Sequence, residues 1–160
     1  TIDLLDHFKE VTPDSLNYLI KDMFETITLY QNRVVSTESR KLDNGKYEVD
    51  IEFRVSKYRN NEKGRIFYGD EERDSISYKN DKMKKPEYSV YLSDYVDVGI
   101  FGEKDDKETE LYLKKHKINS INNKLTIVVD EEPVEVGIDP YNKLIDTNSE
   151  DNRKKISPSL

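Results

Sequence analysis

The amino-acid sequence predicts a mainly β protein, an antiparallel β-sandwich preceded by one amphipathic helix. From position 33 onward, apolar and polar residues alternate with a period of two in several runs, which is typical of strands with one buried face. Short polar loops join these runs and no helical pattern lies between them, so a parallel sheet with crossover helices is not expected. Counting the runs gives about seven strands, the number in an immunoglobulin-like sandwich.

The amphipathic helix is predicted to begin at Thr12-Pro13, because threonine can cap a helix and proline suits its first position. A shorter apolar pattern in residues 1–10 indicates one or two further helical turns. We assign residues 1–32 to an N-terminal helical connector. Its apolar residues recur every three or four positions and form one stripe, which consists of Leu16, Leu19, Ile20, Met23, Phe24, Ile27 and Tyr30.

The first hairpin carries the clearest strand pattern. A strand-like run from Val34 to Leu42 leads into Asp43-Asn44-Gly45, and the Asn-Gly pair favours a tight turn because both residues tolerate positive φ. One face of the return strand is expected to be buried and the other solvated. The apolar face carries Tyr47, Val49, Ile51, Phe53 and Val55, and the polar face carries Glu48, Asp50, Glu52 and Arg54.

Shorter strands are predicted to complete the domain. We place them at residues 66–68, 88–101, 111–118, 125–129 and 134–138, and we interpret residues 69–87 as a loop or a short edge strand. These assignments make residues 33–146 one β-sandwich domain. Residues 147–160 are polar and are expected to form a flexible tail.

The composition limits the classes of function. The chain has 160 residues and a formal charge of −7, so a nucleic-acid groove, which needs concentrated positive charge, is not expected. There is no cysteine, and therefore no disulfide or thiolate metal site. No apolar run approaches the about 20 residues that span a bilayer. The chain starts at Thr1 rather than Met, so we expect it to be a piece of a longer protein.

No catalytic or cofactor-binding residue is predicted. The two histidines, His7 and His116, are far apart, whereas a zinc peptidase needs two histidines and a glutamate in H-E-x-x-H. There is no G-x-S-x-G sequence, and the six glycines are scattered rather than clustered before a helix. We interpret most tyrosines as packing residues of the sheets rather than as a ligand platform.

The acidic runs raise the question of calcium, which binds six to eight oxygen ligands. The calcium candidates are Asp146, Asn148 and Asp151, because Asp146-x-Asn148-x-Glu150 imitates the start of an EF-hand loop. The glycine of the sharp turn is missing, and the twelfth position is Ser157 rather than glutamate. We therefore prefer a solvated turn and predict no metal site. Other carboxylate runs are Asp70-Glu71-Glu72, Asp105-Asp106 and Asp130-Glu131-Glu132, and the basic run Lys82-Met-Lys-Lys85 is interpreted as a solvated loop.

The segment from Val134 to Asp146 marks the end of the last strand. Asp139-Pro140 stops the strand, because aspartate bonds to nearby backbone amides and proline lacks a ladder donor. Asp139, Asn142 and Asp146 are interpreted as turn formers rather than as ligands.

Two stretches resemble a known family. Residues 12–33, which begin Thr12-Pro-Asp-Ser-Leu-Asn-Tyr-Leu, are similar to the segment after the peptidase region in aminopeptidase N-like zinc metallopeptidases (gluzincins) of Bacteroidetes. Gly137-Ile-Asp-Pro-Tyr-Asn-Lys-Leu-Ile-Asp146, with Asp151-Asn152 after it, is similar to their extreme C-terminus. In that group the peptidase is often fused behind an ABC-transporter-like permease.

The resemblance implies a non-catalytic C-terminal β domain, because the zinc ligands and catalytic glutamate of the family lie upstream and none carries over to this sequence. Zinc is then expected only in the parent's catalytic part. The implied partners are that catalytic part and another envelope protein, and the implied location is a soluble domain of a bacterial inner-membrane protein. An alternative is an independent module that binds a glycan, a peptide or an envelope protein through loops at one end of the sandwich. A third option is a hydrolase with a carboxylate pair.

Overall fold

The computed structural model describes residues 2–60, 66–67 and 92–157. The chain forms two compact units. Among the described residues, the first unit contains residues 2–29, 57–60 and 66–67, and the second contains residues 30–56 and 92–157. The sequence-based division into residues 1–32, 33–146 and 147–160 stays a prediction, and these two units partition the chain differently.

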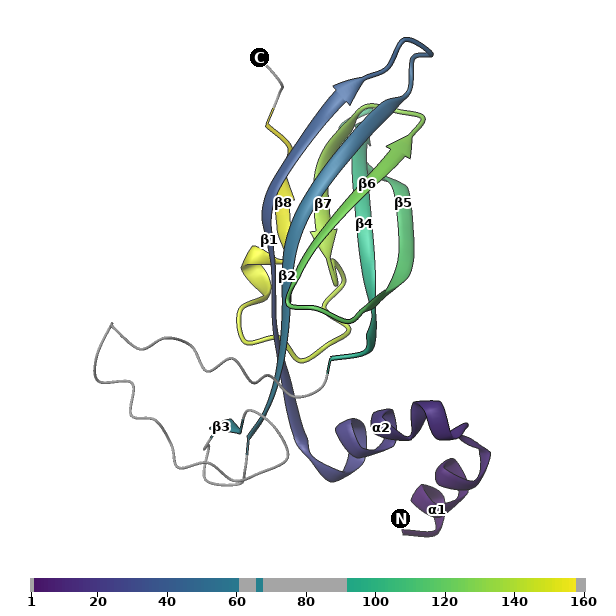
Figure 1. The fold of residues 1–160 in the computed structure, drawn as a ribbon. Coiled ribbons are helices and arrows are strands. Elements are labelled where there is room, and N and C mark those ends of the chain that lie inside the picture. The colour runs from purple at the N-terminus through teal and green to yellow at the C-terminus, as the bar shows by residue number, and fades with distance from the viewer. Residues whose placement is uncertain (1, 61–65, 68–91, 158–160) are drawn as a thin grey trace, which may run out of the picture. The chain divides into compact units, whose positions relative to one another are not determined.

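The second unit is a β-sandwich, which confirms the predicted fold class. Seven strands form two antiparallel sheets, with three strands in one layer and four in the other (Figure 1). The first sheet contains β1 (Ile27–Lys41), β2 (Tyr47–Asn60) and β6 (Asn122–Val129). The second sheet has the order β5-β4-β7-β8, with β4 (Asp94–Lys104), β5 (Lys107–Ile118), β7 (Pro133–Ile138) and β8 (Arg153–Lys155).

The strand order is that of an immunoglobulin-like sandwich. β2 pairs with β6 across the first sheet, while β4 pairs with β7 and β7 with β8 in the second. In an immunoglobulin domain, strand B likewise neighbours E, and C, F and G are consecutive. With β5 as strand C′, the chain crosses between the layers in the same places.

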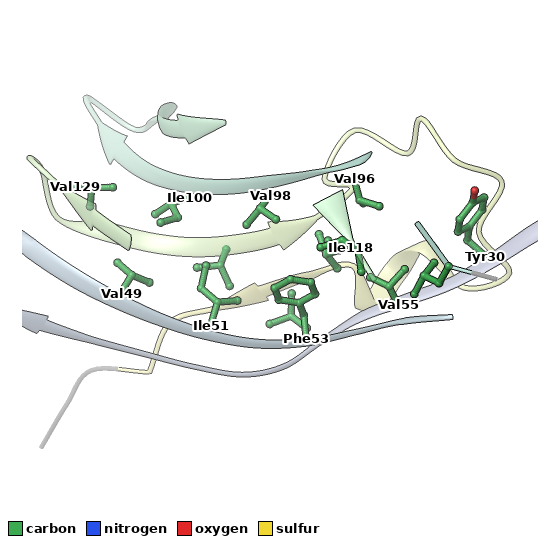
Figure 2. Packing of buried hydrophobic residues seen from close by; sticks show 14 residues of the cluster. Tyr30, Val49, Ile51, Phe53, Val55, Val96, Val98, Ile100, Ile118 and Val129 are labelled. Atoms are coloured by element: carbon green, nitrogen blue, oxygen red, sulfur yellow. The ribbon is translucent and has the colours of Figure 1, made fainter. Parts of the chain in front are cut away.

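The core lies between the two sheets (Figure 2). The predicted alternation on β2 is confirmed, since Val49, Ile51, Phe53 and Val55 are buried. They face side chains of the second sheet, and each buried Val, Ile or Phe contributes roughly 1.5–3 kcal/mol of transfer free energy. The core residues of that sheet are Val96, Val98, Ile100, Ile118, Val136 and Ile138. The predicted hairpin is also confirmed: Gly45 has φ 83°, and the Leu42 amide donates to the Lys46 carbonyl at 2.8 Å.

The N-terminal region consists of short helices instead of the one amphipathic helix that the sequence predicts. They are α1 (Ile2–Val11), the 3-10 turn η1 (Asp14–Leu16), α2 (Asn17–Ile20) and the π turn η2 (Lys21–Glu25). Helix ends at Glu25 because Thr26 is extended and its hydroxyl donates to the Lys21 carbonyl at 3.0 Å. Ile27 and Tyr30 therefore belong to β1. None of the helices within the described residues is long and apolar enough to cross a bilayer.

Thr12 closes the preceding helix rather than opening the next one. Its hydroxyl and its amide both bond to the Phe8 carbonyl, at 2.6 and 3.0 Å. The N-cap of η1 is Pro13, which makes no side-chain bond. The predicted threonine cap is therefore wrong, since Thr12 satisfies a C-terminal carbonyl of α1.

Two further differences concern short strands. β8 lies within the segment that the sequence predicts to be a flexible tail, and it pairs with β7 from Glu135↔Lys155 to Gly137↔Arg153. The tail prediction is wrong for this strand because cross-strand charge pairs support it despite its polar sequence. β3 (Ile66–Phe67) pairs with the end of β2. It lies within the short strand that the sequence predicts at residues 66–68. The loop predicted at residues 69–87 lies outside the described residues.

The C-terminal segment joins the two sheets along one side of the sandwich. Tyr30 on β1 forms a parallel bridge with Asp146: its amide donates to the Ile145 carbonyl at 2.8 Å, and its carbonyl accepts the Thr147 amide at 3.0 Å. A second bridge pairs Glu38 with Ser157. On the other side, the edge strands are β5 and β6. Lys114 and His116 of β5 share a face with core residues, and such inward polar groups discourage edge pairing.

Deleting residues 149–160 is expected to destabilise the sandwich by more than about 2 kcal/mol, because β8 and its side-chain contacts are lost. The measurement is the free energy of unfolding from urea denaturation. Lys124→Ala, at an exposed position of β6 in the other sheet, is the control and should leave stability nearly unchanged. Equal stability of all three proteins would contradict the assignment of β8 to the folded unit.

Candidate functional site

The turn after β7 begins with Asp139-Pro140, and its geometry is set by aspartate. Asp139 and Asn142 have positive φ values of 46° and 52°. The Asp139 carboxylate is buried, and it accepts the Lys143 amide at 3.0 Å and the Leu144 amide at 2.9 Å. The prediction that Asp139 is a turn former is confirmed by these bonds, because they use both carboxylate oxygens to hold the backbone.

Two glycines leave the space against which this turn packs. Gly99 on β4 and Gly137 on β7 lie opposite each other. A Cβ atom added to Gly137 would lie 2.8 Å from Pro140 Cβ, and one added to Gly99 would lie 2.8 Å from the Phe101 ring and 3.1 Å from Pro140 Cγ. Pro140 therefore occupies a notch that exists because both strand residues lack a side chain.

Phe101 lies beside this notch on the sheet face that points away from the core, yet it is fully buried. The Arg153 guanidinium lies 4.2 Å from the centroid of its ring, and the Tyr141 ring meets it edge-on at 6.1 Å. Arg153 also pairs with Glu108 and, at 2.7 Å, with Glu135. Burial lowers the pKa of Arg153, but the two glutamates raise it by more, and the net shift is upward.

Asp97 ties the turn to β4 and β5. Its carboxylate pairs with Lys143 at 2.7 Å and with Lys115 at 3.4 Å, and its carbonyl accepts the Asp139 amide at 2.7 Å. Burial raises the pKa of Asp97, but the two lysines lower it by more, and the net shift is downward. The pKa of Asp139 is raised, because burial outweighs its two backbone hydrogen bonds.

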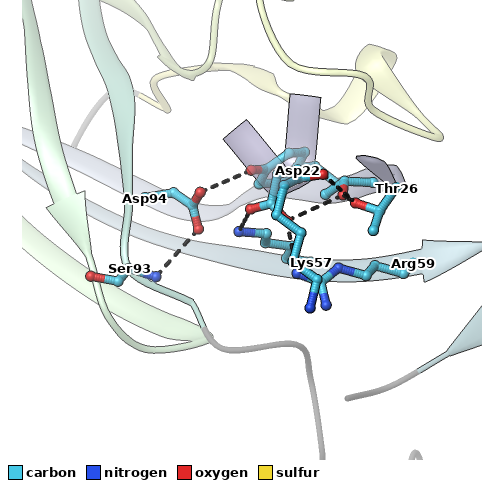
Figure 3. Close-up of polar contacts among 9 residues, drawn as sticks. Asp22, Thr26, Lys57, Arg59, Ser93 and Asp94 are labelled. Atoms are coloured by element: carbon cyan, nitrogen blue, oxygen red, sulfur yellow. Dashed lines mark hydrogen bonds and ion pairs between the residues drawn. The ribbon is translucent and has the colours of Figure 1, made fainter. Parts of the chain in front are cut away.

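The first unit contains a buried charge cluster (Figure 3). The Asp22 carboxylate from η2 pairs with Lys57 and, at 2.9 Å, with Arg59, both from the end of β2. The Lys57 side chain is only 1% exposed, and its ammonium lies 5.3 Å from the centre of the Tyr18 ring. Thr28 adds a hydrogen bond to Asp22 at 3.4 Å. A buried charge needs such partners, because an unpaired one costs several kcal/mol.

Sequence reasoning missed this cluster, although a signal was present. Lys57 continues the series of buried positions at Val49, Ile51, Phe53 and Val55, with the same spacing of two. A lysine at the next inward position of a strand is a candidate for a buried, paired cation.

The two histidines are not brought together. His7 is exposed on α1, where Nδ1 lies 3.7 Å from Glu10. His116 lies on β5, and its Nε2 is 2.7 Å from the Tyr112 hydroxyl. Burial and, to a smaller extent, the nearby Lys114 lower the pKa of His116.

The calcium candidates have structural contacts of their own. Asp146 Oδ2 accepts the Asn32 amide at 2.9 Å, and Oδ1 accepts the Asn148 amide at 2.9 Å, which is the turn-forming role predicted for Asp146. Asn148 is exposed and Asp151 is half-buried. Within residues 2–60, 66–67 and 92–157, no group of three His, Asp or Glu side chains is placed to hold a metal ion.

The other charged runs are divided between turns and the undescribed part of the chain. Asp105 and Asp106 form the β4–β5 turn with φ values of 51° and 57°. Asp130, Glu131 and Glu132 connect β6 to β7. The runs Asp70-Glu71-Glu72 and Lys82-Met-Lys-Lys85 lie outside the described residues.

Comparison with known proteins yields no match: no protein-family model, curated protein or solved structure is similar to this chain. The resemblance to aminopeptidase N-like proteins therefore stays a prediction. In the constellations described above, charged groups bond to one another or to backbone amides, an arrangement suited to holding the fold and presenting a surface.

The lowered pKa of His116 predicts a specific pH dependence. As pH falls below the ordinary histidine value of 6.5, the unfolded chain binds a proton before the folded one does. The stability that neutral His116 provides is therefore complete above this pH and decreases as pH falls through the folded pKa. We expect His116→Gln to flatten the decline in unfolding free energy between about pH 7 and 5.

The exposed His7 offers a matched control. Urea denaturation at several pH values should give the wild-type profile for His7→Gln and the flatter profile for His116→Gln. Identical slopes for all three proteins would contradict the assigned environment of His116.

Proposed function

We propose that this chain is the non-catalytic C-terminal accessory domain of a membrane-associated aminopeptidase N-like zinc metallopeptidase. In this proposal, the N-terminal helices pack on the parent's catalytic part, and the sandwich shapes access to its cleft. The zinc ion belongs to that upstream part, and no residue of this chain is proposed as its ligand. The similarity of residues 12–33 and of Gly137-Ile-Asp-Pro-Tyr-Asn-Lys-Leu-Ile-Asp146 to the family supports the choice of parent.

One structural observation carries the docking role: the helical region exposes large apolar side chains. Helix α1 buries none of its residues. Ile2 is 75% exposed, Val11 78% and Met23 69%. Phe8 and Phe24 stack on each other at 5.7 Å, yet both keep exposed surface. The exposed apolar residues of this region, called the helical apolar surface below, are Ile2, Leu4, Phe8, Val11, Met23, Phe24 and Ile27.

Such a surface is unfavourable in water and favourable at an interface. Each large apolar side chain gains about 1.5–3 kcal/mol when it is fully buried. A cluster of apolar side chains on a protein surface commonly marks the place where another protein or domain packs. An ion pair between Lys9 and Glu25 at 2.6 Å links α1 to η2, so the apolar residues of both elements belong to one folded region.

The proposal is tested in the longer protein. We expect the sequence upstream of Thr1 to contain H-E-x-x-H. In that protein, Val11→Asp with Met23→Asp should lower aminopeptidase turnover and the unfolding temperature, because two charges would face the catalytic part. Val128→Asp is the matched control: this side chain is 48% exposed on β6 and belongs to the second unit rather than to the helical apolar surface.

If the sequence upstream of Thr1 contained no H-E-x-x-H, the proposed aminopeptidase N-like parent would be excluded. Unchanged turnover and folding, both in the double variant and after deletion of residues 34–146, would contradict the accessory role and favour the independent recognition module.

A further inference from the structure

The outer face of the second sheet has charges of opposite sign at its two ends. We define the outer face as the side of β5-β4-β7-β8 that points away from the core. Val96, Val98 and Ile100 point into the core, so the alternate residues of β4 point outward. In order along β4, the outward residues are Tyr95, Asp97, Gly99, Phe101 and Glu103.

The first end is basic and aromatic. Lys117 lies opposite Tyr95 in the β4–β5 register, with its ammonium 5.9 Å from the centre of the ring. Lys115 and Lys143 flank Asp97, and their side chains are 60% and 54% exposed. Tyr95 is half-exposed beside them. Three lysines outnumber the two carboxylates at this end, which are Asp97 and the buried Asp139 near Lys143. This end is therefore net positive, in a chain whose formal charge is −7.

The second end is acidic and concave. Glu103 and Glu108 lie directly opposite each other on β4 and β5, an unfavourable pairing of like charges. Together with Glu132 and Glu135 they line part of a pocket of about 480 Å³, which extends past the edge of the sheet to Ser39 of β1. Arg153 pairs with Glu108 and Glu135, and Lys155 lies at the pocket wall. Four glutamates against two cations leave an excess of negative charge.

The two ends act as separate patches. Glu103 lies six positions after Asp97 on β4, which is roughly 20 Å at the usual rise per residue. This separation exceeds the Debye length of about 8 Å at physiological ionic strength, so the charges of one end do not neutralise those of the other. Between the ends lies the Tyr141 ring, which is 47% exposed.

We propose that a second copy of this chain covers the outer face in a two-fold, antiparallel arrangement. A two-fold axis near the centre of the face places the lysine end of each copy on the glutamate end of the other. Each lysine cluster then meets the opposed Glu103 and Glu108 of the other copy. A second copy fits this face by charge complementarity, because the same face carries a basic end and an acidic end. This inference concerns the second unit and does not depend on the proposed accessory function.

Charge reversal tests the arrangement. Lys117→Glu and Glu103→Lys should each weaken self-association of the full chain by roughly tenfold or more, because like charges then meet at both ends of the interface. An equimolar mixture should associate as the wild type does. In the mixed dimer, one contact pairs the two reversed residues and the other pairs the two native ones, so both are attractive. Lys124→Glu, on the outer side of β6, is the control for the change in net charge.

The measurement is sedimentation equilibrium over a range of concentrations at low and high salt, with circular dichroism to verify folding. The expected result is a wild-type dimer that weakens with salt, two weakened variants and a restored mixture. A wild type that is monomeric at every concentration overturns the proposal, as do variants that associate normally or a mixture that is not restored. These outcomes leave the accessory role untouched, because that role is tested by the helical apolar surface variants.

Discussion

The arrangement of the second unit depends on the packing of Pro140 against Gly99 and Gly137. It holds the turn against the sheet, where the Asp139 carboxylate bonds to the Lys143 and Leu144 amides. From there the chain returns to β1, where residues 145–147 bond to Tyr30. Tyr30 in turn donates its hydroxyl to Asp94 at the start of β4. Residues 139–147 thus join the two sheets by backbone bonds, in addition to the shared core.

The sequence predicts those parts of the fold where one physical rule dominates. Period-two burial identifies β2, and Asn-Gly chemistry identifies its hairpin. The helix prediction fails where rules compete, because Met23, Phe24 and Ile27 have helical spacing while Thr26 and Ile27 favour extended backbone. β8 is not predicted because its stability comes from cross-strand partners such as Glu135. The Asp22 cluster is not predicted because residues 22 and 57 are distant in sequence. The strand pattern does place Lys57 at an inward position, since it follows Val55 with the same spacing of two.

The two units offer surfaces of different chemistry. The helical apolar surface of the first unit is uncharged at its exposed positions and gains from burial, which suits a lasting contact with a larger protein. The outer face of the sandwich carries charged groups of both signs, which suits a contact that depends on salt. The proposed docking and the proposed self-association therefore use separate parts of the chain and respond to different changes in solution.

The segment from Val134 to Asp146 has a structural role in this fold, because its side chains hold the turn against the sheet. The most direct measurement is the free energy of unfolding of Gly137→Ala, whose new Cβ would meet Pro140 at 2.8 Å. We expect a loss of roughly 1–3 kcal/mol from overpacking. Gly45→Asn, at a turn with positive φ and open space, is the control and should be nearly neutral. If Gly137→Ala were as stable as the wild type, Pro140 would not be packed against Gly137, and the structural role of this turn would be contradicted.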